Sequence, residues 1–122
     1  MNINLSSLPK TWIFDIDGTI VKHNGYKSGK DILLDGVLET FNKIPDTDMI
    51  IIITSRNKKF RSSTEKFLRD NGIRYNIIIF DAPVGERVLI NDDKLSGLCM
   101  SYAIRKSRDS ELEINYSIDD TL

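Results

Sequence analysis

Short apolar runs recur along this sequence and constrain its fold more than any other feature. Three runs lie at residues 11–15, 49–54 and 76–80, and two shorter runs follow at 88–91 and 102–104. Their lengths and their β-branched residues predict five strands. In the first run the apolar residues are consecutive, which is typical of a strand that is buried on both faces.

Helical patterns separate the first three runs. Asp35 can cap a helix that includes Val37 and ends at Pro45. Residues 57–71 predict a second helix, which stops at Gly72. Strands that alternate with helices imply right-handed crossovers. The sequence therefore predicts an α/β fold with a Rossmann-like open parallel sheet of about five strands and flanking helices.

The chain length of 122 residues is enough for one hydrophobic core, so we expect a single domain over 1–122. Its core should span about 11–105, followed by a charged tail at 106–122. The loops at 20–34 and 72–87 are too short to hold a cap domain. A site at the edge of the sheet should therefore be open to solvent.

Composition narrows the class of protein and its partners. The formal net charge of −1 supplies no overall basic field for nucleic acid or anionic lipid. The longest apolar run, 49–53, is far too short to cross a bilayer. The single cysteine, Cys99, precludes an intramolecular disulfide and fits a reducing compartment. We expect a cytoplasmic protein, with neither nucleic acid nor membrane favoured as a partner.

Polar side chains stand where three of the predicted strands end. They are Asp15 and Asp17 after the first strand, Thr54 and Ser55 after the second, and Asp92 and Asp93 after the fourth. Ligands of open parallel sheets bind beyond the carboxyl ends of the strands. Four carboxylates at one such edge repel one another unless a cation lies between them. Because the ligands are hard oxygens without His or Cys, they point to Mg²⁺ rather than zinc.

The first of these pairs suits phosphoryl transfer. Asp15 and Asp17 are two residues apart and can lean toward one pocket, while Gly18 lets the backbone turn and present its amides to an anion. One carboxylate can attack phosphorus, and the other can protonate the leaving oxygen and then activate water. Thr54 and Ser55, before a predicted helix, offer hydroxyls and amides to phosphoryl oxygens.

Three segments resemble signatures of the haloacid dehalogenase superfamily. WIFDIDGTI at 12–20 is similar to the first signature, IIIIT at 50–54 to the second and VLINDD at 88–93 to the acidic fourth. The likeness spans residue 12 to about residue 104. GERVLINDDK at 85–94 is similar to small capless members that often accompany surface-carbohydrate biosynthesis.

The resemblance implies roles for individual residues. Asp15 would be the nucleophile, and Asp17 the general acid and base, whose backbone carbonyl also binds the metal. Thr54 would bind the phosphoryl group. Asp92 would be a metal carboxylate with Asp93 as its helper, so that Asp15, Asp17, Asp92 and Asp93 surround the Mg²⁺. Further candidates for contacts with the substrate are Gly18, Thr19, Ser55 and Arg56.

The third signature, a Lys or Arg beside the nucleophile and the phosphate, has no clear counterpart. No lysine stands within 67–93, so the candidates are Arg74, Arg87 and Lys94. We favour Arg87 for this catalytic role because it begins the strand that leads to Asp92. The other two candidates stay open.

These features predict an Mg²⁺-dependent phosphatase that cleaves a phosphorylated sugar or a related small metabolite through an aspartyl phosphate. Three alternatives remain. A non-catalytic binding module of the same family would explain the unclear third signature. A phosphatase that acts on the terminal phosphates of nucleic acids is the second alternative. The near-neutral net charge of the protein disfavours it, because nucleic acid is strongly negative. A receiver-type phospho-acceptor domain would keep its hydroxyl after the fourth strand, whereas here the hydroxyls follow the second.

A site that is open to solvent needs another part of a protein to cover it, and this chain is too short to supply a cap domain. We expect the polar loop 21–30, the tail after Lys106, or both to contact a second copy, so that the working form is a homo-oligomer. His23, the sole histidine, lies in that polar loop and is expected to be a surface residue rather than a catalyst.

Overall fold

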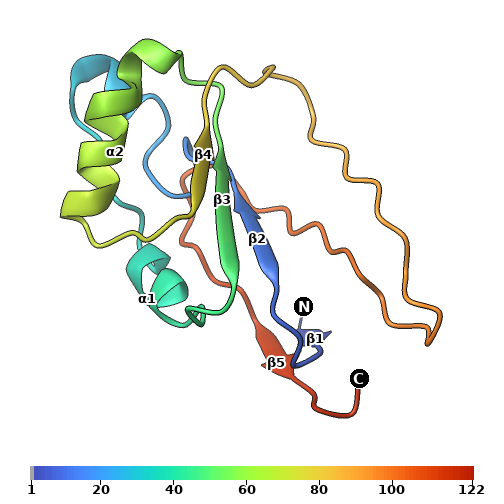
Figure 1. The fold of residues 1–122 in the computed structure, drawn as a ribbon. Coiled ribbons are helices and arrows are strands. Elements are labelled where there is room, and N and C mark those ends of the chain that lie inside the picture. The colour runs from blue at the N-terminus through green and yellow to red at the C-terminus, as the bar shows by residue number, and fades with distance from the viewer. Residues whose placement is uncertain (1) are drawn as a thin grey trace.

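Three of the predicted strands form a parallel sheet at the centre of the protein. A computed structural model describes residues 2–122. Its elements in chain order are β1 Ile3–Leu5, β2 Thr11–Phe14, η1 Gly25–Ser28, α1 Val37–Asn42, β3 Met49–Ile53, η2 Lys58–Phe60, α2 Arg61–Asp70, β4 Ile77–Ile79 and β5 Tyr116–Ile118 (Figure 1). The central sheet has the order β2-β3-β4, and both of its strand pairs are parallel.

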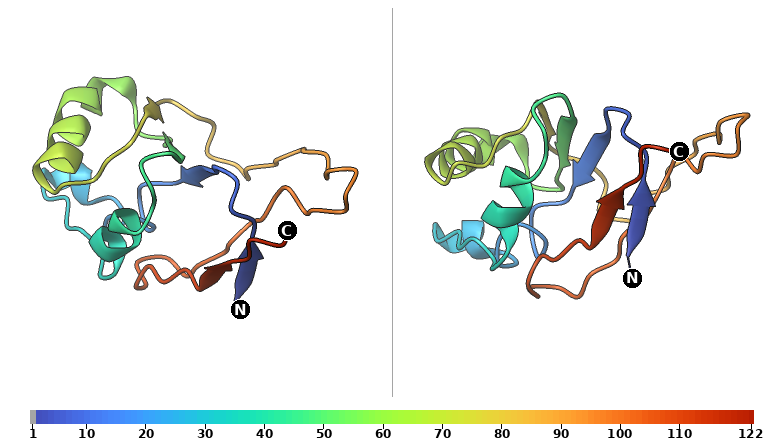
Figure 2. Two further views of the ribbon diagram at one scale, coloured as in Figure 1. Left: turned by 60° about the horizontal axis from the view of Figure 1, so that its bottom comes forward. Right: turned by 90° about the horizontal axis from the view of Figure 1, so that it is seen from below.

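The register of the central sheet divides its residues into an inner and an outer row. Phe14, Ile52 and Ile78 lie side by side on the inner face and are buried. They belong to a hydrophobic core that also contains Phe41 of α1 and Leu68 of α2. Both helices therefore cover the same face of the sheet, as the views of Figure 2 also show.

The outer face of the sheet is largely uncovered, so the expectation that the first strand is buried on both faces is wrong. Ile13, Ile51 and Ile77 lie side by side on this face, and Ile13 is 52% exposed. An uninterrupted apolar run shows that a strand can be buried on both faces. It does not show which element covers the second face.

The predicted single sheet of about five strands is also wrong. Residues 88–91 and 102–104 form no strand, and they belong to a long irregular stretch that projects from the body of the protein (Figures 1 and 2). We call residues 83–105 the outer segment. Val88 and Ile90 within it are 78% and 86% exposed. A run of three apolar residues is a weak strand signal, because strand formation depends on a neighbour to pair and pack with.

A second, two-stranded sheet joins the two ends of the chain. β1 pairs in parallel with β5, and the ring of Tyr116 packs 5.3 Å from that of Trp12. The fold is therefore mixed α/β with two open parallel sheets. Among the described residues, no helix is long and apolar enough to cross a membrane.

The helices begin and end close to the predicted positions, but Asp35 does not cap α1. The N-cap is Gly36, which has φ 81° and makes no side-chain cap. A Cβ atom on Gly36 would lie 2.2 Å from the carbonyl oxygen of Leu112, so the tail packs where only glycine leaves room. The second predicted helix divides into η2 and α2, and Asn57 caps η2 by accepting from the amide of Lys59.

Candidate functional site

The candidate site lies at the carboxyl end of β2, where the chain makes a tight turn. The carbonyl oxygen of Ile16 accepts hydrogen bonds from the amides of Thr19, Ile20 and Val21, at 3.1, 2.8 and 3.2 Å. Gly18, with φ 85°, donates from its amide to Val21 at 2.7 Å. Because Ile16, Ile20 and Val21 are buried, the turn is fixed to the core.

Asp15 stands at the surface of this turn, where a ligand can reach it. Desolvation is the largest influence on its carboxyl group and raises its pKa above the usual value. A hydrogen bond from the amide of Ile16 opposes the rise, whereas the negative charge of Asp17 adds to it. The positive charge of Arg87 also lowers the pKa of Asp15, and so does His23 in its protonated form.

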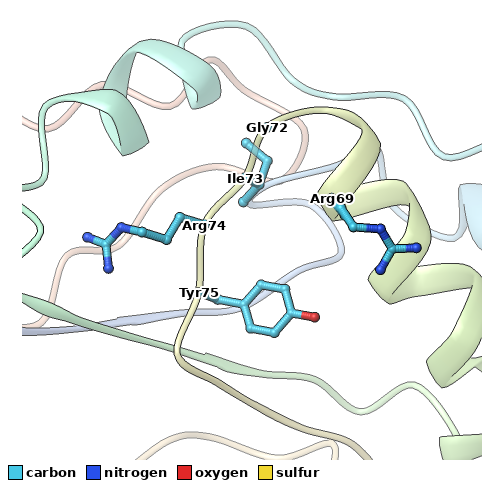
Figure 3. A pocket seen from close by; sticks show the side chains of 5 residues that line it. All are labelled: Arg69, Gly72, Ile73, Arg74 and Tyr75. Carbon is cyan, nitrogen blue, oxygen red and sulfur yellow. The ribbon is translucent and has the colours of Figure 1, made fainter.

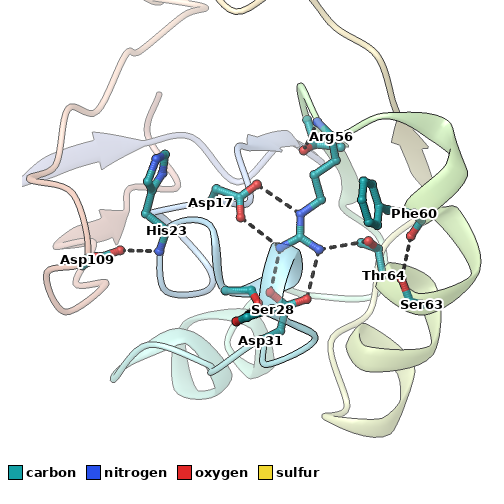
Figure 4. A network of polar contacts seen from close by, with 11 residues as sticks. Asp17, His23, Ser28, Asp31, Arg56, Phe60, Ser63, Thr64 and Asp109 are labelled. Carbon is teal, nitrogen blue, oxygen red and sulfur yellow. Dashed lines mark hydrogen bonds and ion pairs between the residues drawn. The ribbon is translucent and has the colours of Figure 1, made fainter.

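Asp17 faces inward and forms a double hydrogen bond with Arg56. Nε of Arg56 lies 3.1 Å from Oδ2 of Asp17, and Nη2 lies 2.9 Å from Oδ1 (Figure 4). Arg56 is buried, with a side chain only 1% exposed, compared with 16% for Asp17. Both oxygens of this carboxylate are therefore held by one guanidinium.

The guanidinium of Arg56 has two further partners. It donates to both carboxylate oxygens of Asp31, at 2.9 and 3.0 Å, and to the hydroxyl of Thr64 at 2.9 Å. All five N–H groups of the side chain are thus used. Burial works against the charge of Arg56, but its hydrogen bonds to Asp17 and Asp31 outweigh burial and raise its pKa.

An aromatic side chain completes the surroundings of this guanidinium. The ring of Tyr26 lies 4.2 Å from the central carbon of Arg56, and the ring of Phe60 packs edge-on against Tyr26 at 4.8 Å. We call Asp17, Tyr26, Asp31, Arg56 and Thr64 the Arg56 cluster. Arg56 was predicted to bind substrate, and in this arrangement all of its donors are bound within the protein.

Thr54 and Ser55 follow β3, as predicted, but they lie in different surroundings. Thr54 is 1% exposed, and its hydroxyl accepts a hydrogen bond from the amide of Arg56 at 3.1 Å. Ser55 is exposed, and its hydroxyl donates to the carbonyl of Pro83 at 3.3 Å. Ser55 is therefore the more accessible of the two predicted phosphate ligands.

Of the three candidates for the third signature, Arg87 is the one whose charge reaches Asp15. Its guanidinium donates to the carbonyls of Pro83 and Gly85, at 2.9 and 2.8 Å. Lys94 lies in the outer segment and is exposed. Arg74 lies before β4, at the opposite end of the sheet, where it lines a shallow hollow (Figure 3). The residues around that hollow are Arg69, Gly72, Ile73, Arg74 and Tyr75.

The four carboxylates predicted to bind Mg²⁺ are not brought together. Asp92 and Asp93 lie in the outer segment, where a carboxylate oxygen of Asp93 accepts from the amide of Met100 at 3.1 Å. Both oxygens of Asp17 face Arg56. Within residues 2–122, no group of three or more His, Cys, Asp or Glu side chains is placed to hold a metal ion. In this arrangement the residues do not fit a Mg²⁺ site.

The tail contributes to the site of its own chain. The amide of Asp109 donates to the carbonyl of Gly18 at 3.0 Å, and Nζ of Lys106 donates to the same oxygen at 2.9 Å. The carboxylate of Asp109 accepts from the amide of His23 at 2.7 Å. Desolvation lowers the pKa of Lys106. The tail and the polar loop thus meet beside the turn, and the predicted contact with a second copy stays a prediction.

Sequence reasoning missed Asp31, Tyr26 and the tail residues. His23, which was expected at the surface, is half-buried, and its Nδ1 atom is buried without a hydrogen-bond partner. A motif search finds residues near one another in the sequence. Arg56 and Asp31 are 25 residues apart and in no shared motif, so only the fold reveals the pair.

Comparison of the sequence with family profiles, with characterised proteins and with solved structures gives no match. The resemblance to the haloacid dehalogenase signatures therefore depends on the short segments described above.

Proposed function

We propose that this protein is a phosphatase of the haloacid dehalogenase type that acts in the cytoplasm on a phosphorylated sugar or a related small metabolite. The observation that carries the proposal is the arrangement of the turn after β2. It leaves the Asp15 carboxylate accessible and holds the Asp17 carboxylate next to it in a fixed orientation. This arrangement supports two different roles for two neighbouring acids.

The proposed reaction has two steps. In the first, a carboxylate oxygen of Asp15 attacks phosphorus, the bond from phosphorus to the ester oxygen breaks, and Asp17 gives its proton to the leaving oxygen. In the second, Asp17 takes a proton from a water molecule that attacks the same phosphorus atom. The acyl phosphate bond then breaks, releasing inorganic phosphate and restoring the Asp15 carboxylate.

A positive group near Asp15 supports the approach of a phosphate dianion. Arg87 lies close enough for its charge to act on the Asp15 carboxyl group, and so does His23 in its protonated form. Ser55 offers an accessible hydroxyl at the same end of the sheet. We keep Mg²⁺ as the cofactor that the resemblance implies, and we assign no step to it, because the described residues do not assemble its site.

A second candidate function is a non-catalytic binding module of the same family. The observation in its favour is that Asp17 is engaged on both oxygens by Arg56, so that it has no free position for a proton in this arrangement. Such a module would bind phosphorylated compounds at the turn without cleaving them.

Release of inorganic phosphate from a panel of phosphate esters tests the proposal. The panel should contain sugar phosphates, nucleotides and oligonucleotides with terminal phosphates, each with and without Mg²⁺. We expect wild-type protein to cleave sugar phosphates and Asp15→Asn to cleave none of them. Binding of these esters by both proteins, without any release of phosphate, would favour the binding module.

A further inference from the structure

Most backbone amides of the turn after β2 are already used within the turn. The amides of residues 19–21 all donate to the carbonyl oxygen of Ile16, and the amide of Gly18 donates to that of Val21. The amide of Ile16 donates to the carboxylate of Asp15. Side chains must therefore supply most of the hydrogen bonds that a phosphoryl group receives at Asp15.

The polar side chains that follow β3 have their donors engaged as well. All the N–H groups of Arg56 are bound within the protein, and the hydroxyl of Ser55 gives its proton to a backbone carbonyl. Two other basic side chains remain near Asp15. Arg87 and, in its protonated form, His23 act on the Asp15 carboxyl group through their charge.

The tail holds His23 beside the turn. The carboxylate of Asp109 accepts from the amide of His23 at 2.7 Å (Figure 4), and the amide of Asp109 donates to the carbonyl of Gly18 at 3.0 Å. Nζ of Lys106 donates to the same carbonyl at 2.9 Å. The backbone of His23 is therefore fixed next to Gly18 by a residue that lies 86 positions further along the chain.

The two ring nitrogens of His23 have different surroundings. Nδ1 is buried and has no hydrogen-bond partner among residues 2–122. A proton on Nδ1 would form an N–H group buried without an acceptor, which costs more than an unpaired lone pair. The neutral ring therefore carries its proton on Nε2. Because His23 is only half-buried and Nε2 is not enclosed as Nδ1 is, this N–H donor is open to a ligand.

We propose that His23 is an anion-binding residue, which donates from Nε2 to an oxygen of the phosphoryl group held at Asp15. The ligand is a phosphate monoester or inorganic phosphate. The inference rests on the proposed function in placing a phosphoryl group at Asp15, and it applies to the enzyme and to the binding module alike. Since the accessible nitrogen already carries the proton, the neutral ring binds the anion and takes no proton from the attacking water.

The first measurement uses the fact that His23 is the sole histidine of the chain. Isotope-labelled protein, expressed without a histidine tag, gives a single pair of ring-nitrogen signals in NMR spectra. Their couplings to the ring protons show which nitrogen carries the proton. Above the usual titration range of histidine, we expect the proton on Nε2 in the free protein. Inorganic phosphate, added with Mg²⁺, should then shift the Nε2 signal more than the Nδ1 signal.

The second measurement compares the binding of inorganic phosphate by wild type and three variants, using calorimetry. His23→Phe keeps a ring without a donor, and His23→Gln keeps an amide N–H near the position of Nε2. The control Lys22→Gln removes an exposed positive charge from the adjacent position. We expect binding to be about tenfold or more weaker in His23→Phe. It should stay within about threefold of wild type in His23→Gln and in Lys22→Gln.

Three results would overturn the role of His23. They are a proton on Nδ1 in the free protein, equal phosphate binding by wild type and His23→Phe, and an equal loss in His23→Phe and Lys22→Gln. The last result would mean that only the charge of the loop matters. If circular dichroism shows that His23→Phe does not fold, the ring signals of wild type decide, and an Nε2 signal that phosphate does not shift overturns the role.

The measurements also separate this role from the proposed function. Phosphate binding that shifts the Nε2 signal, without cleavage of any ester by wild type, supports the role of His23 and overturns the phosphatase. Cleavage of esters by wild type, with equal phosphate binding by His23→Phe, overturns the role of His23 and leaves the phosphatase standing. Absence of phosphate binding to wild type overturns the role of His23, and the panel of esters then decides about the phosphatase alone.

Discussion

The Arg56 cluster and the outer segment show opposite relations between polarity and burial. Arg56, the most strongly basic type of side chain, is 2% exposed, whereas Val88 and Ile90 are 78% and 86% exposed. Arg56 is buried because each of its donors has an acceptor, which offsets the loss of hydration. Val88 and Ile90 stay exposed because no other segment packs on them. Partners, more than hydropathy, decide burial in these two regions.

The largest effect that we predict concerns the turn next to the cluster. Asp15→Asn should lower turnover by at least about 10⁴-fold, because it removes the nucleophile at nearly constant shape. Measuring phosphate release together with circular dichroism separates this loss from unfolding. Activity close to wild type in a folded Asp15→Asn variant would show that Asp15 does not attack phosphorus.

The second prediction tests whether partners hold Arg56 in the core. Arg56→Met leaves the carboxylates of Asp17 and Asp31 together without a cation, and it should lower the free energy of unfolding by about 3–5 kcal/mol. The matched control is Lys66→Met, which breaks the exposed ion pair with Asp70 on α2. Exposed pairs of this kind contribute about 0.3–0.5 kcal/mol. If urea unfolding shows equal losses in the free energy of unfolding for both variants, the buried partners of Arg56 stabilise the protein no more than an exposed ion pair does.

The third prediction asks whether the outer segment gains a partner when metal binds. We expect a chelator to silence the enzyme and Mg²⁺ to restore it, because carboxylates and a phosphate dianion need a counter-charge. Lys94 in the outer segment is exposed and open to trypsin. If Asp92 and Asp15 bind the same Mg²⁺ ion, the outer segment should become ordered around it, and trypsin should then cleave more slowly after Lys94. Full activity in chelator would contradict the assignment of Asp92 and Asp93 to Mg²⁺.

The sequence predicted the parts of the fold in which local pattern and packing agree. The runs that became β2, β3 and β4 are stretches of consecutive apolar residues, the two helices carry apolar residues at helical spacing, and each element has a neighbour to pack on. The run at 88–90 has the same local pattern without a neighbour. The pairing of β1 with β5 was not predictable, because it joins segments more than 100 residues apart that carry little pattern of their own.

The candidate site was predictable only in part, for the same reason. Short spacing brought Asp15, Asp17 and Gly18 into one turn, and the chain order of the strands brought Thr54 and Arg56 to the same end of the sheet. The partners of Arg56 depend on how the loop at residues 21–34 folds back over it. The spacing of residues along the sequence does not predict this fold. The tail residues Lys106 and Asp109 reach the turn through a packing contact between distant segments.

The fourth prediction concerns the effect of pH on stability at Asp15. Its pKa is raised in the folded protein above the ordinary value near 3.8, so the folded state binds this proton more tightly than the unfolded state. The resulting stabilisation is fully present below pH 3.8 and is lost as the pH rises through the folded pKa. At pH 7, Asp15→Asn should therefore raise Tm by a small amount. The difference in Tm should shrink as the pH falls toward 3.8. A lower Tm at pH 7 would contradict the raised pKa.

The smallest effect is expected in the outer segment. It tests whether the exposed apolar side chains of this segment lack packing partners. Ile90→Thr replaces an exposed apolar side chain by a polar one of similar shape and should change the free energy of unfolding by less than about 0.5 kcal/mol. The matched change Ile52→Thr, in the buried row of β3, should cost about 2 kcal/mol or more, because the hydroxyl enters the core without a partner. Urea unfolding of both variants compares their free energies of unfolding directly.

A loss in Ile90→Thr as large as that in Ile52→Thr would mean that the outer segment packs against something in solution, either the bare face of its own sheet or a second copy of the chain. Concentration-dependent stability of the wild type would then identify the second copy, because a contact within one chain does not depend on protein concentration.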